Sequence, residues 1–224
     1  MKYVVSTIRP WNIEIFKKTI SKYPGKWYLI SNPKELTLKT LNEIKPKYIF
    51  FPHWSEIVSK DILEKYECIG FHEADLPYGR GGSPVQNLIL LGKNKSKISA
   101  FHMTDELDSG EIYMKTNISL KGTAQEIFER NAKIVAKMIK RIISKKPERK
   151  SQKGKVIFFK RRTPSQSDIS KNIFESTNEF YNFIRALDAN TYPKAFLKSG
   201  NNRIEFFNPI KKGRKIICNI QITK

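Results

Sequence analysis

The chain has 224 residues, of which 42 are lysine or arginine and 21 are aspartate or glutamate, so its formal net charge is +21. A hydrophobic fraction of 39% in regularly spaced segments excludes a disordered polycation, and no stretch is long and apolar enough to span a bilayer. The charge indicates a polyanionic partner such as RNA, anionic lipid or a nucleotide diphosphate, but a lysine-rich bias throughout the chain explains it equally well.

The N-terminus has no uninterrupted apolar run of the kind found in signal peptides. The two cysteines, Cys68 and Cys218, lie far apart in the sequence, which favours a reducing compartment over a disulfide framework. We therefore expect a cytoplasmic protein.

The first part of the chain alternates predicted strands with predicted helices. Apolar runs predict strands at residues 2–8, 27–31, 48–51, 68–71, 98–103 and 112–116. Helical spacing of apolar residues predicts helices at residues 13–20, 35–43, 57–66 and 84–91, and a long one after the capping-box pattern of residues 123–126. This alternation predicts a Rossmann-like α/β domain with a mostly parallel sheet over residues 1–150.

The composition of the sequence changes after the long predicted helix. Residues 145–155 are basic, polar and almost free of apolar side chains, which is typical of a connector. Beyond them we expect short strands at residues 156–159, 195–198 and 203–207, and a helix at residues 177–187. Residues 151–224 are therefore predicted to form a small C-terminal α+β subdomain.

Two loop segments carry the residues that are most suited to chemistry. One runs from His72 to Pro84 and reads His-Glu-Ala-Asp-Leu-Pro-Tyr-Gly-Arg-Gly-Gly-Ser-Pro; the other is Leu-Asp-Ser-Gly, with Asp108 as its acidic residue. At the carboxyl edge of a parallel sheet they would form one polar pocket. Taken alone, a histidine at a strand end and an aspartate in a turn are more often structural. No cluster has metal-ligand spacing, and no phosphate-binding loop or nucleophile elbow is present.

Four segments together resemble the 10-formyltetrahydrofolate-dependent formyltransferases. They read FPHWSEIVSKDIL, IGFHEADLPYGRGGSPVQNLILLG, FHMTDELDSGEIYMK and FFKRRTPSQSDI…IRALDANTYPKAF, in that order along the chain. The second contains His-x-x-x-Leu-Pro-x-x-Arg-Gly-x-x-Pro without a gap. The family includes methionyl-tRNA formyltransferase and the sugar-nucleotide N-formyltransferases.

The resemblance implies a catalytic Asn-x-His triplet and a distant aspartate. His72 matches the histidine and Asp108 the aspartate, but Gly70 stands at the asparagine position. Protonated His72, held by Asp108, is then expected to stabilise the tetrahedral intermediate, and Asp108 with water to take up the amine proton. Glycine cannot donate a hydrogen bond to the formyl oxygen, so we expect a water, a backbone N–H or the Asn87 amide to replace it.

The resemblance also implies a binding site for the formyl donor, 10-formyltetrahydrofolate, in the strand-end loops, and no metal. The matching positions are Phe51, Pro52, His53, Trp54, Leu76, Tyr78, Gly79, Arg80, Thr104 and Asp105. Loop packing is the alternative role for Trp54 and Tyr78.

The acceptor amine is harder to predict. The C-terminal region resembles a shortened, partly OB-like version of the domain that grips tRNA, which argues against tRNA. The form of the His72 segment is similar to a branch of surface-glycan biosynthesis, so the first expectation is a UDP-4-amino-4,6-dideoxy-N-acetyl-altrosamine substrate. Arg9 or Arg80 would meet its pyrophosphate, Trp11 or Tyr78 would stack on its uracil or sugar, and Asn87 would lie in the substrate site. The alternatives are a methionyl-tRNA formyltransferase and a non-catalytic RNA- or folate-binding homologue. Apolar strands in a small C-terminal subdomain favour a homodimer.

Overall fold

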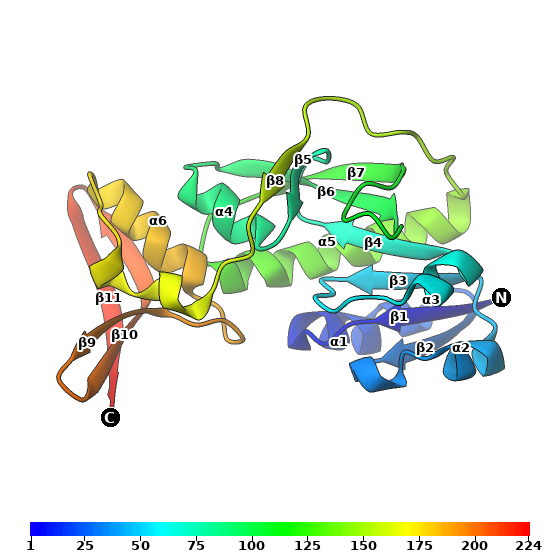
Figure 1. The fold of residues 1–224 in the computed structure, drawn as a ribbon, viewed down its shortest axis with the longest axis horizontal. Coiled ribbons are helices and arrows are strands. Elements are labelled where there is room, and N and C mark those ends of the chain that lie inside the picture. The colour runs from blue at the N-terminus through cyan, green and yellow to red at the C-terminus, as the bar shows by residue number, and fades with distance from the viewer. The chain divides into compact units, whose positions relative to one another are not determined.

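A computed structural model describes residues 1–224, and its main feature is a six-stranded sheet in the order β2-β1-β3-β4-β6-β7 (Figure 1). Its strands are β1 (Lys2–Ser6), β2 (Lys26–Ile30), β3 (Tyr48–Pro52), β4 (Cys68–His72), β6 (Lys95–His102) and β7 (Ile112–Ser119). The first four pair in parallel, whereas β6 runs antiparallel to β4. The predicted α/β fold with a mostly parallel sheet is confirmed.

The apolar runs of the sequence are the centre of this sheet. Ile49, Phe50 and Ile69 are fully buried, as expected for strands that are covered on both faces. Leu41 of one helix and Ile62 of another belong to the same core cluster as Ile49. The core therefore lies around β3 and β4, and it holds the strand that ends at His72.

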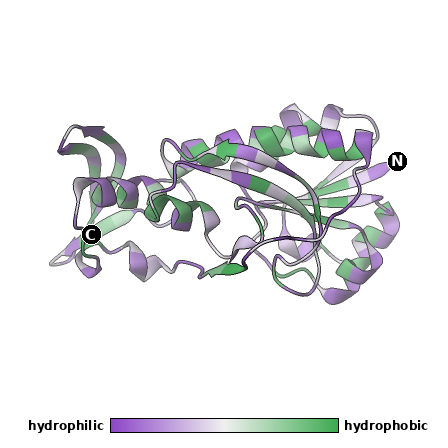
Figure 2. Cartoon of the chain, turned by 90° about the horizontal axis from the view of Figure 1, so that it is seen from above, coloured by the Kyte–Doolittle hydropathy of each residue, from purple (hydrophilic) through white to green (hydrophobic).

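Four helices accompany this sheet, and the threonine side chains of Thr37 and Thr123 cap the second and the fourth of them. They are α1 (Pro10–Lys18), α2 (Leu38–Ile44), α3 (Lys60–Lys65) and α5 (Ala124–Lys145), with short 3-10 turns at Ile20–Lys22 and Pro33–Glu35. The predicted capping box forms, since the Thr123 N–H donates to the Glu126 carboxylate at 2.8 Å and the Glu126 N–H donates to the Thr123 hydroxyl at 3.3 Å. Figure 2 shows the long helix α5 along one face of the sheet, with hydrophobic and hydrophilic residues alternating along it.

The chain divides into two compact units, which are described separately. The first consists of residues 1–81, 97–118 and 129–158, and the second of residues 82–96, 119–128 and 159–224. The contiguous division at residue 150 stays a prediction. No helix of the structure is long and apolar enough to cross a membrane. Both cysteines are free.

The second unit contains an antiparallel sheet of three strands in the order β11-β10-β9, beside α4 (Pro84–Leu90) and α6 (Thr177–Leu187). Its strands are β9 (Ala195–Ser199), β10 (Asn202–Lys212) and β11 (Lys215–Thr223), and 3-10 turns lie at Pro164–Ser167 and Ile169–Lys171. Phe183, Ile184 and Leu187 of α6 form a core cluster with Ala195 of β9. Arg185 is buried, and its guanidinium donates to the carbonyls of Leu120 and Gly122 at 2.6 and 2.8 Å.

A two-stranded sheet joins β5 (Tyr78–Gly81) to β8 (Ile157–Phe159). The sequence predicts a loop for the glycine-rich segment that contains β5. It is a strand because the carbonyl of Phe159 and its neighbours offer a backbone partner, for example to the Gly82 N–H at 3.0 Å. β8 therefore lies beside the segment from His72 to Pro84, which contains β5.

Candidate active site

His72 is the last residue of β4 and is 7% exposed. Its Nε2 lies 2.6 Å from the carbonyl oxygen of Gly79, and its Nδ1 lies 3.5 Å from Oδ2 of Asp108. Both ring nitrogens therefore face oxygen acceptors. This arrangement suits an imidazolium, which donates from both nitrogens.

Asp108 is held in place by the turn that surrounds it. Its Oδ2 accepts a hydrogen bond from the Gly81 N–H at 2.8 Å, and its backbone adopts a left-handed conformation with φ 51°. A side chain at Gly110 would place its Cβ 1.8 Å from the carbonyl oxygen of His102. Only glycine fits there, so the Asp-Ser-Gly turn is required to bring Asp108 against β5 and His72.

Gly70, at the position of the family asparagine, has no room for a side chain. A Cβ there would lie 2.6 Å from a ring carbon of Phe101 and 3.1 Å from Cγ of Met103. Both distances are shorter than ordinary carbon contacts, so the ring of Phe101 fills the space that an asparagine would need. A hydrogen-bond donor for a formyl oxygen must therefore come from another residue or from water.

The Asn87 amide is already engaged within the second unit. Its Nδ2 donates to the carbonyls of Gly82 at 3.0 Å and Lys160 at 3.1 Å. Both N–H groups of the amide are used in these bonds. The expectation that Asn87 replaces the asparagine therefore gains no support from the structure.

A second histidine–carboxylate pair lies beside the first. Nδ1 of His53 is 3.5 Å from Oε1 of Glu73, and both side chains are almost completely buried. Burial raises the pKa of Glu73 to about 7, with the charge of Asp108 adding to this rise and that of Arg9 opposing it. Burial, with smaller contributions from the charges of Arg9 and His72, lowers the pKa of His53 to about 3. Near neutral pH the imidazole is uncharged and the carboxyl group titrates.

Glu73 was not selected in the sequence analysis. The signal that could have found it is its place, directly after His72 on a strand whose residues are all buried. A carboxyl group at such a position must be neutral or paired.

Arg80 contacts a side chain from the connector. Its Nε and Nη2 donate to Oε1 of Gln152 at 3.2 and 2.9 Å, and its Nη1 lies 3.5 Å from Oε1 of Glu106. Nε2 of Gln152 donates to the carbonyls of Asp108 and Gly110, both at 2.8 Å. Gln152 is not predictable from the sequence, because nothing in a polar connector distinguishes one glutamine from its neighbours.

The predicted folate residues at the end of β3 and directly after it are largely engaged in packing. Phe51 is 2% exposed in the core, and the ring of Trp54 packs edge-on against it at 5.8 Å. The Pro52 carbonyl accepts from the hydroxyl of Thr7 at 2.8 Å and from the amide of Asn12 at 3.3 Å. The indole N–H of Trp54 is buried and has no hydrogen-bond partner. The ring of Trp54 thus serves loop packing, while its N–H is left for another acceptor.

The other predicted ligand-binding residues have mixed surroundings. Leu76 is fully buried, whereas Tyr78 is half-buried. Trp11 is 5% exposed and meets the ring of His53 edge-on at 5.4 Å, so it has no open face on which a uracil or sugar could stack. Arg9 lies close enough to Glu73 and His53 to influence their charges. No group of three histidine, cysteine or acidic residues lies together as a metal site would require.

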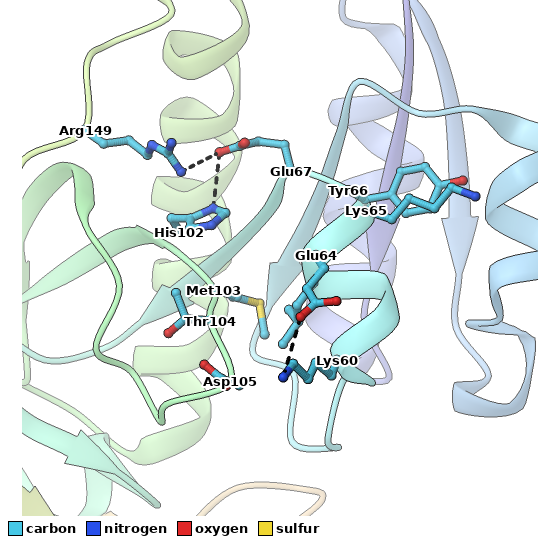
Figure 3. Close-up of a pocket in the computed structure, with 11 residues that line it drawn as sticks. Lys60, Glu64, Lys65, Tyr66, Glu67, His102, Met103, Thr104, Asp105 and Arg149 are labelled. Atoms are coloured by element: carbon cyan, nitrogen blue, oxygen red, sulfur yellow. Dashed lines mark hydrogen bonds and ion pairs between the residues drawn. The ribbon is translucent and has the colours of Figure 1, made fainter.

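Thr104 and Asp105 line an open pocket of about 510 Å³ (Figure 3). The pocket is bounded by Lys60, Leu63, Glu64, Lys65, Tyr66, Glu67, His102, Met103, Thr104, Asp105 and Arg149. Glu67 forms the polar centre of one side, where its Oε1 lies 3.2 Å from Nδ1 of His102 and 3.3 Å from Nη1 of Arg149. The remaining predicted folate residues do not line this pocket.

A comparison with models of known protein families shows the family to which the chain belongs. A model described as "Formyl transferase" matches residues 17–143, which is more than half of the chain. The chain belongs to the formyl transferase family. A second model, described as "Methionyl-tRNA formyltransferase, C-terminal domain", matches residues 164–223. The resemblance drawn from the His72 segment is thereby confirmed at the level of the family.

Comparison with individual members of the formyl transferase family shows which of them are more similar to this chain. The methionyl-tRNA formyltransferase of Bacillus cytotoxicus is 31% identical over 162 residues, covering 68% of this chain and 50% of that protein. The chain spans about half the length of the curated relatives that it matches. A solved structure of methionyl-tRNA formyltransferase from Clostridium thermocellum is 42% identical, with a TM-score of 0.92, and covers 100% of this chain and 99% of that one.

A 4-N formyltransferase from Francisella tularensis has the same fold at 17% identity, with a TM-score of 0.68 over 89% of this chain and 93% of that one. The comparisons thus support the alternative acceptor, methionyl-tRNA, better than the sugar nucleotide that we expected first.

Proposed function

We propose that the chain transfers the formyl group of 10-formyltetrahydrofolate to a primary amine. The observation that carries this proposal is the buried His72–Asp108 pair in a chain of the formyl transferase family. In the reaction, the acceptor nitrogen bonds to the formyl carbon, and the bond from that carbon to the folate nitrogen breaks. The proton that the amine loses ends on that folate nitrogen.

His72 and Asp108 supply the electrostatic part of this reaction. Negative charge develops on the formyl oxygen as the amine attacks, and an imidazolium N–H directed at that oxygen stabilises the charge. One N–H of His72 then exchanges its present acceptor for the formyl oxygen. Asp108 keeps the ring charged and oriented, since its carboxylate is itself fixed by the Gly81 N–H.

The surroundings of His72 fit the formyl donor. The buried indole N–H of Trp54 has no partner, and the loop of Thr104 and Asp105 borders an open polar pocket. A pterin ring carries hydrogen-bond acceptors that match such a donor, and its glutamate tail suits an open polar surface. When bound, the folate supplies an activated formyl carbon. The protein groups that we assign to its binding are the loops of residues 51–54, 76–80 and 104–108.

Methionyl-tRNA is the first candidate for the acceptor. The relatives that support it are the methionyl-tRNA formyltransferases described above, and the formal charge of +21 is compatible with either acceptor. A nucleotide-linked amino sugar is the second candidate. It rests on the form of the His72 segment, because the small second unit matches the C-terminal domain of methionyl-tRNA formyltransferase and does not separate the two acceptors.

The experiment that tests the proposal follows release of tetrahydrofolate with several acceptors side by side. Methionyl-tRNA and UDP-, dTDP- and GDP-linked amino sugars are each incubated with 10-formyltetrahydrofolate and the full chain. We expect turnover with methionyl-tRNA, and its loss in His72→Ala. Turnover with an amino sugar alone would change the acceptor, and folate binding without any turnover would support a non-catalytic homologue.

A further inference from the structure

Four hydrogen bonds converge on the side chain of Gln152. Its Oε1 accepts two bonds from the guanidinium of Arg80, and its Nε2 donates one bond each to the carbonyls of Asp108 and Gly110. A primary amide has two N–H donors and two lone pairs on its oxygen. The hydrogen-bonding capacity of the amide is therefore used in full.

The partners of Gln152 require an amide in this orientation. A guanidinium can only donate and a carbonyl oxygen can only accept, so the amide cannot be turned by 180°. A glutamate would keep the bonds to Arg80 but would place a carboxylate oxygen against the carbonyl oxygens of Asp108 and Gly110. An alanine would remove the bonds to Arg80 and the bonds to the two carbonyl oxygens.

The backbone beside Gln152 is anchored to the sheet. Lys150 and Ile112 exchange two backbone hydrogen bonds, of 2.8 and 3.0 Å, and Arg149 forms ion pairs with Glu67 at 3.3 Å and with Glu111 at 3.5 Å. The Gln152 side chain thus projects from a segment whose backbone is hydrogen-bonded to β7. Figure 3 shows the Arg149–Glu67 end of this attachment.

We propose that Gln152 is a positioning residue that fixes the Asp108 turn and the Arg80 loop relative to each other, and so sets the contact between Asp108 and His72. For its kinetic consequence this inference rests on the proposed function. Gln152 touches neither His72 nor the carboxylate of Asp108; it acts through the main chain of the turn and through Arg80. Gly81 follows Arg80 in the chain, and its N–H donates to the Asp108 carboxylate at 2.8 Å. Exchange of this N–H therefore reports directly on the distance between the Arg80 loop and the Asp108 turn.

The test compares Gln152→Glu and Gln152→Ala with Gln221→Glu, which makes the same charge change at an exposed glutamine of β11. Formyl transfer is measured as kcat and KM, hydrogen exchange of the Gly81 amide is followed in the folded protein, and the unfolding temperature is recorded. We expect both Gln152 variants to lose about 100-fold in kcat, because displacement by roughly 1 Å has an effect of this size. The KM for folate should change much less, and the Gly81 amide should exchange at least about tenfold faster.

The two levels of the claim can fail separately. If the wild-type chain transfers no formyl group to any acceptor, the proposed function fails, and exchange of the Gly81 amide still decides the role of Gln152. Unchanged Gly81 exchange and wild-type kcat in Gln152→Glu would overturn the inference. A loss of activity that follows only a lowered unfolding temperature in both variants would also overturn it, because Gln152 would then be structural alone.

Discussion

Two histidine–carboxylate pairs lie side by side in the first unit, and they share their separation and their burial but differ in the groups around them. His72 and Asp108 are 3.5 Å apart, and so are His53 and Glu73. In the first pair, the carbonyl oxygen of Gly79 accepts from the His72 ring and the Gly81 N–H donates to the Asp108 carboxylate. In the second pair, burial dominates and drives the pKa values of its members apart, toward neutral forms. Two pairs of equal separation thus have different surroundings: neighbouring backbone groups contact His72 and Asp108, and the pKa values of His53 and Glu73 are shifted toward the neutral forms.

The largest effect should come from the first pair. We expect His72→Ala to reduce formyl transfer by roughly 1,000-fold, because it removes the imidazolium that faces the developing negative charge. Asp108→Asn should lose more than about 100-fold, since the amide no longer balances the charge of His72. Both variants are measured by tetrahydrofolate release at saturating acceptor. Equal rates for His72→Ala and the wild type would assign the reaction to other residues.

A second prediction concerns the glycine that precedes the first pair. Gly70→Ala should lower the free energy of unfolding by about 1–3 kcal/mol, because its methyl group would overlap the ring of Phe101. Chemical denaturation measures the effect. The double variant Gly70→Ala/Phe101→Leu is the matched test, in which the smaller side chain should make the alanine nearly neutral relative to Phe101→Leu alone. An equal loss in both backgrounds would show that Phe101 is not the obstacle.

A third prediction concerns the pH dependence of stability that Glu73 of the second pair causes. The pKa of Glu73 is raised from 4.5 to about 7, so the folded state holds a proton that the unfolded state releases between these values. The contribution of this group to stability is present below pH 4.5 and is lost as the pH rises through about 7. Glu73→Gln should therefore gain stability relative to the wild type between pH 4.5 and 7, measured by urea denaturation. The control Glu43→Gln, at an exposed position of α2, should give no such trend.

The smallest effect is expected at His53. Its pKa is lowered from 6.5 to about 3, so stability contributed by the neutral ring is lost as the pH falls below 6.5. His53→Gln should remove this loss and should change formyl transfer by less than about tenfold, because the ring lies against Trp11 and Glu73 rather than against Asp108. A loss as large as that of His72→Ala would make the two pairs functionally equivalent.

The sequence predicted those parts of the fold that local patterns determine. The apolar runs gave β1 to β4 within a few residues, and helix α6 was predicted at its observed bounds, Thr177–Leu187. β11 was missed because the lysines around Gly213 resemble a solvated basic run. Pairing with β10 makes a strand of it, with Ile222 opposite Ile204, Ile220 opposite Phe206 and Ile217 opposite Ile210.

The site was predictable only where it lies in a motif. His72 and Asp108 could be found because the two segments that contain them have recognisable spacing. Gln152 could not, since its partners, Arg80 and the carbonyls of the Asp108 turn, are brought to it by tertiary structure. The obstruction at Gly70 was equally hidden, because Phe101 lies on a strand that is adjacent only in the folded sheet.

The most direct test of the account compares the wild-type chain with Asp108→Asn in formyl transfer from 10-formyltetrahydrofolate to methionyl-tRNA. The account predicts formylmethionyl-tRNA with the wild type and a loss of more than about 100-fold in the variant, measured at a temperature at which both proteins are folded. Equal rates for the two proteins, or no transfer by the wild type to methionyl-tRNA or to any amino sugar, would contradict it.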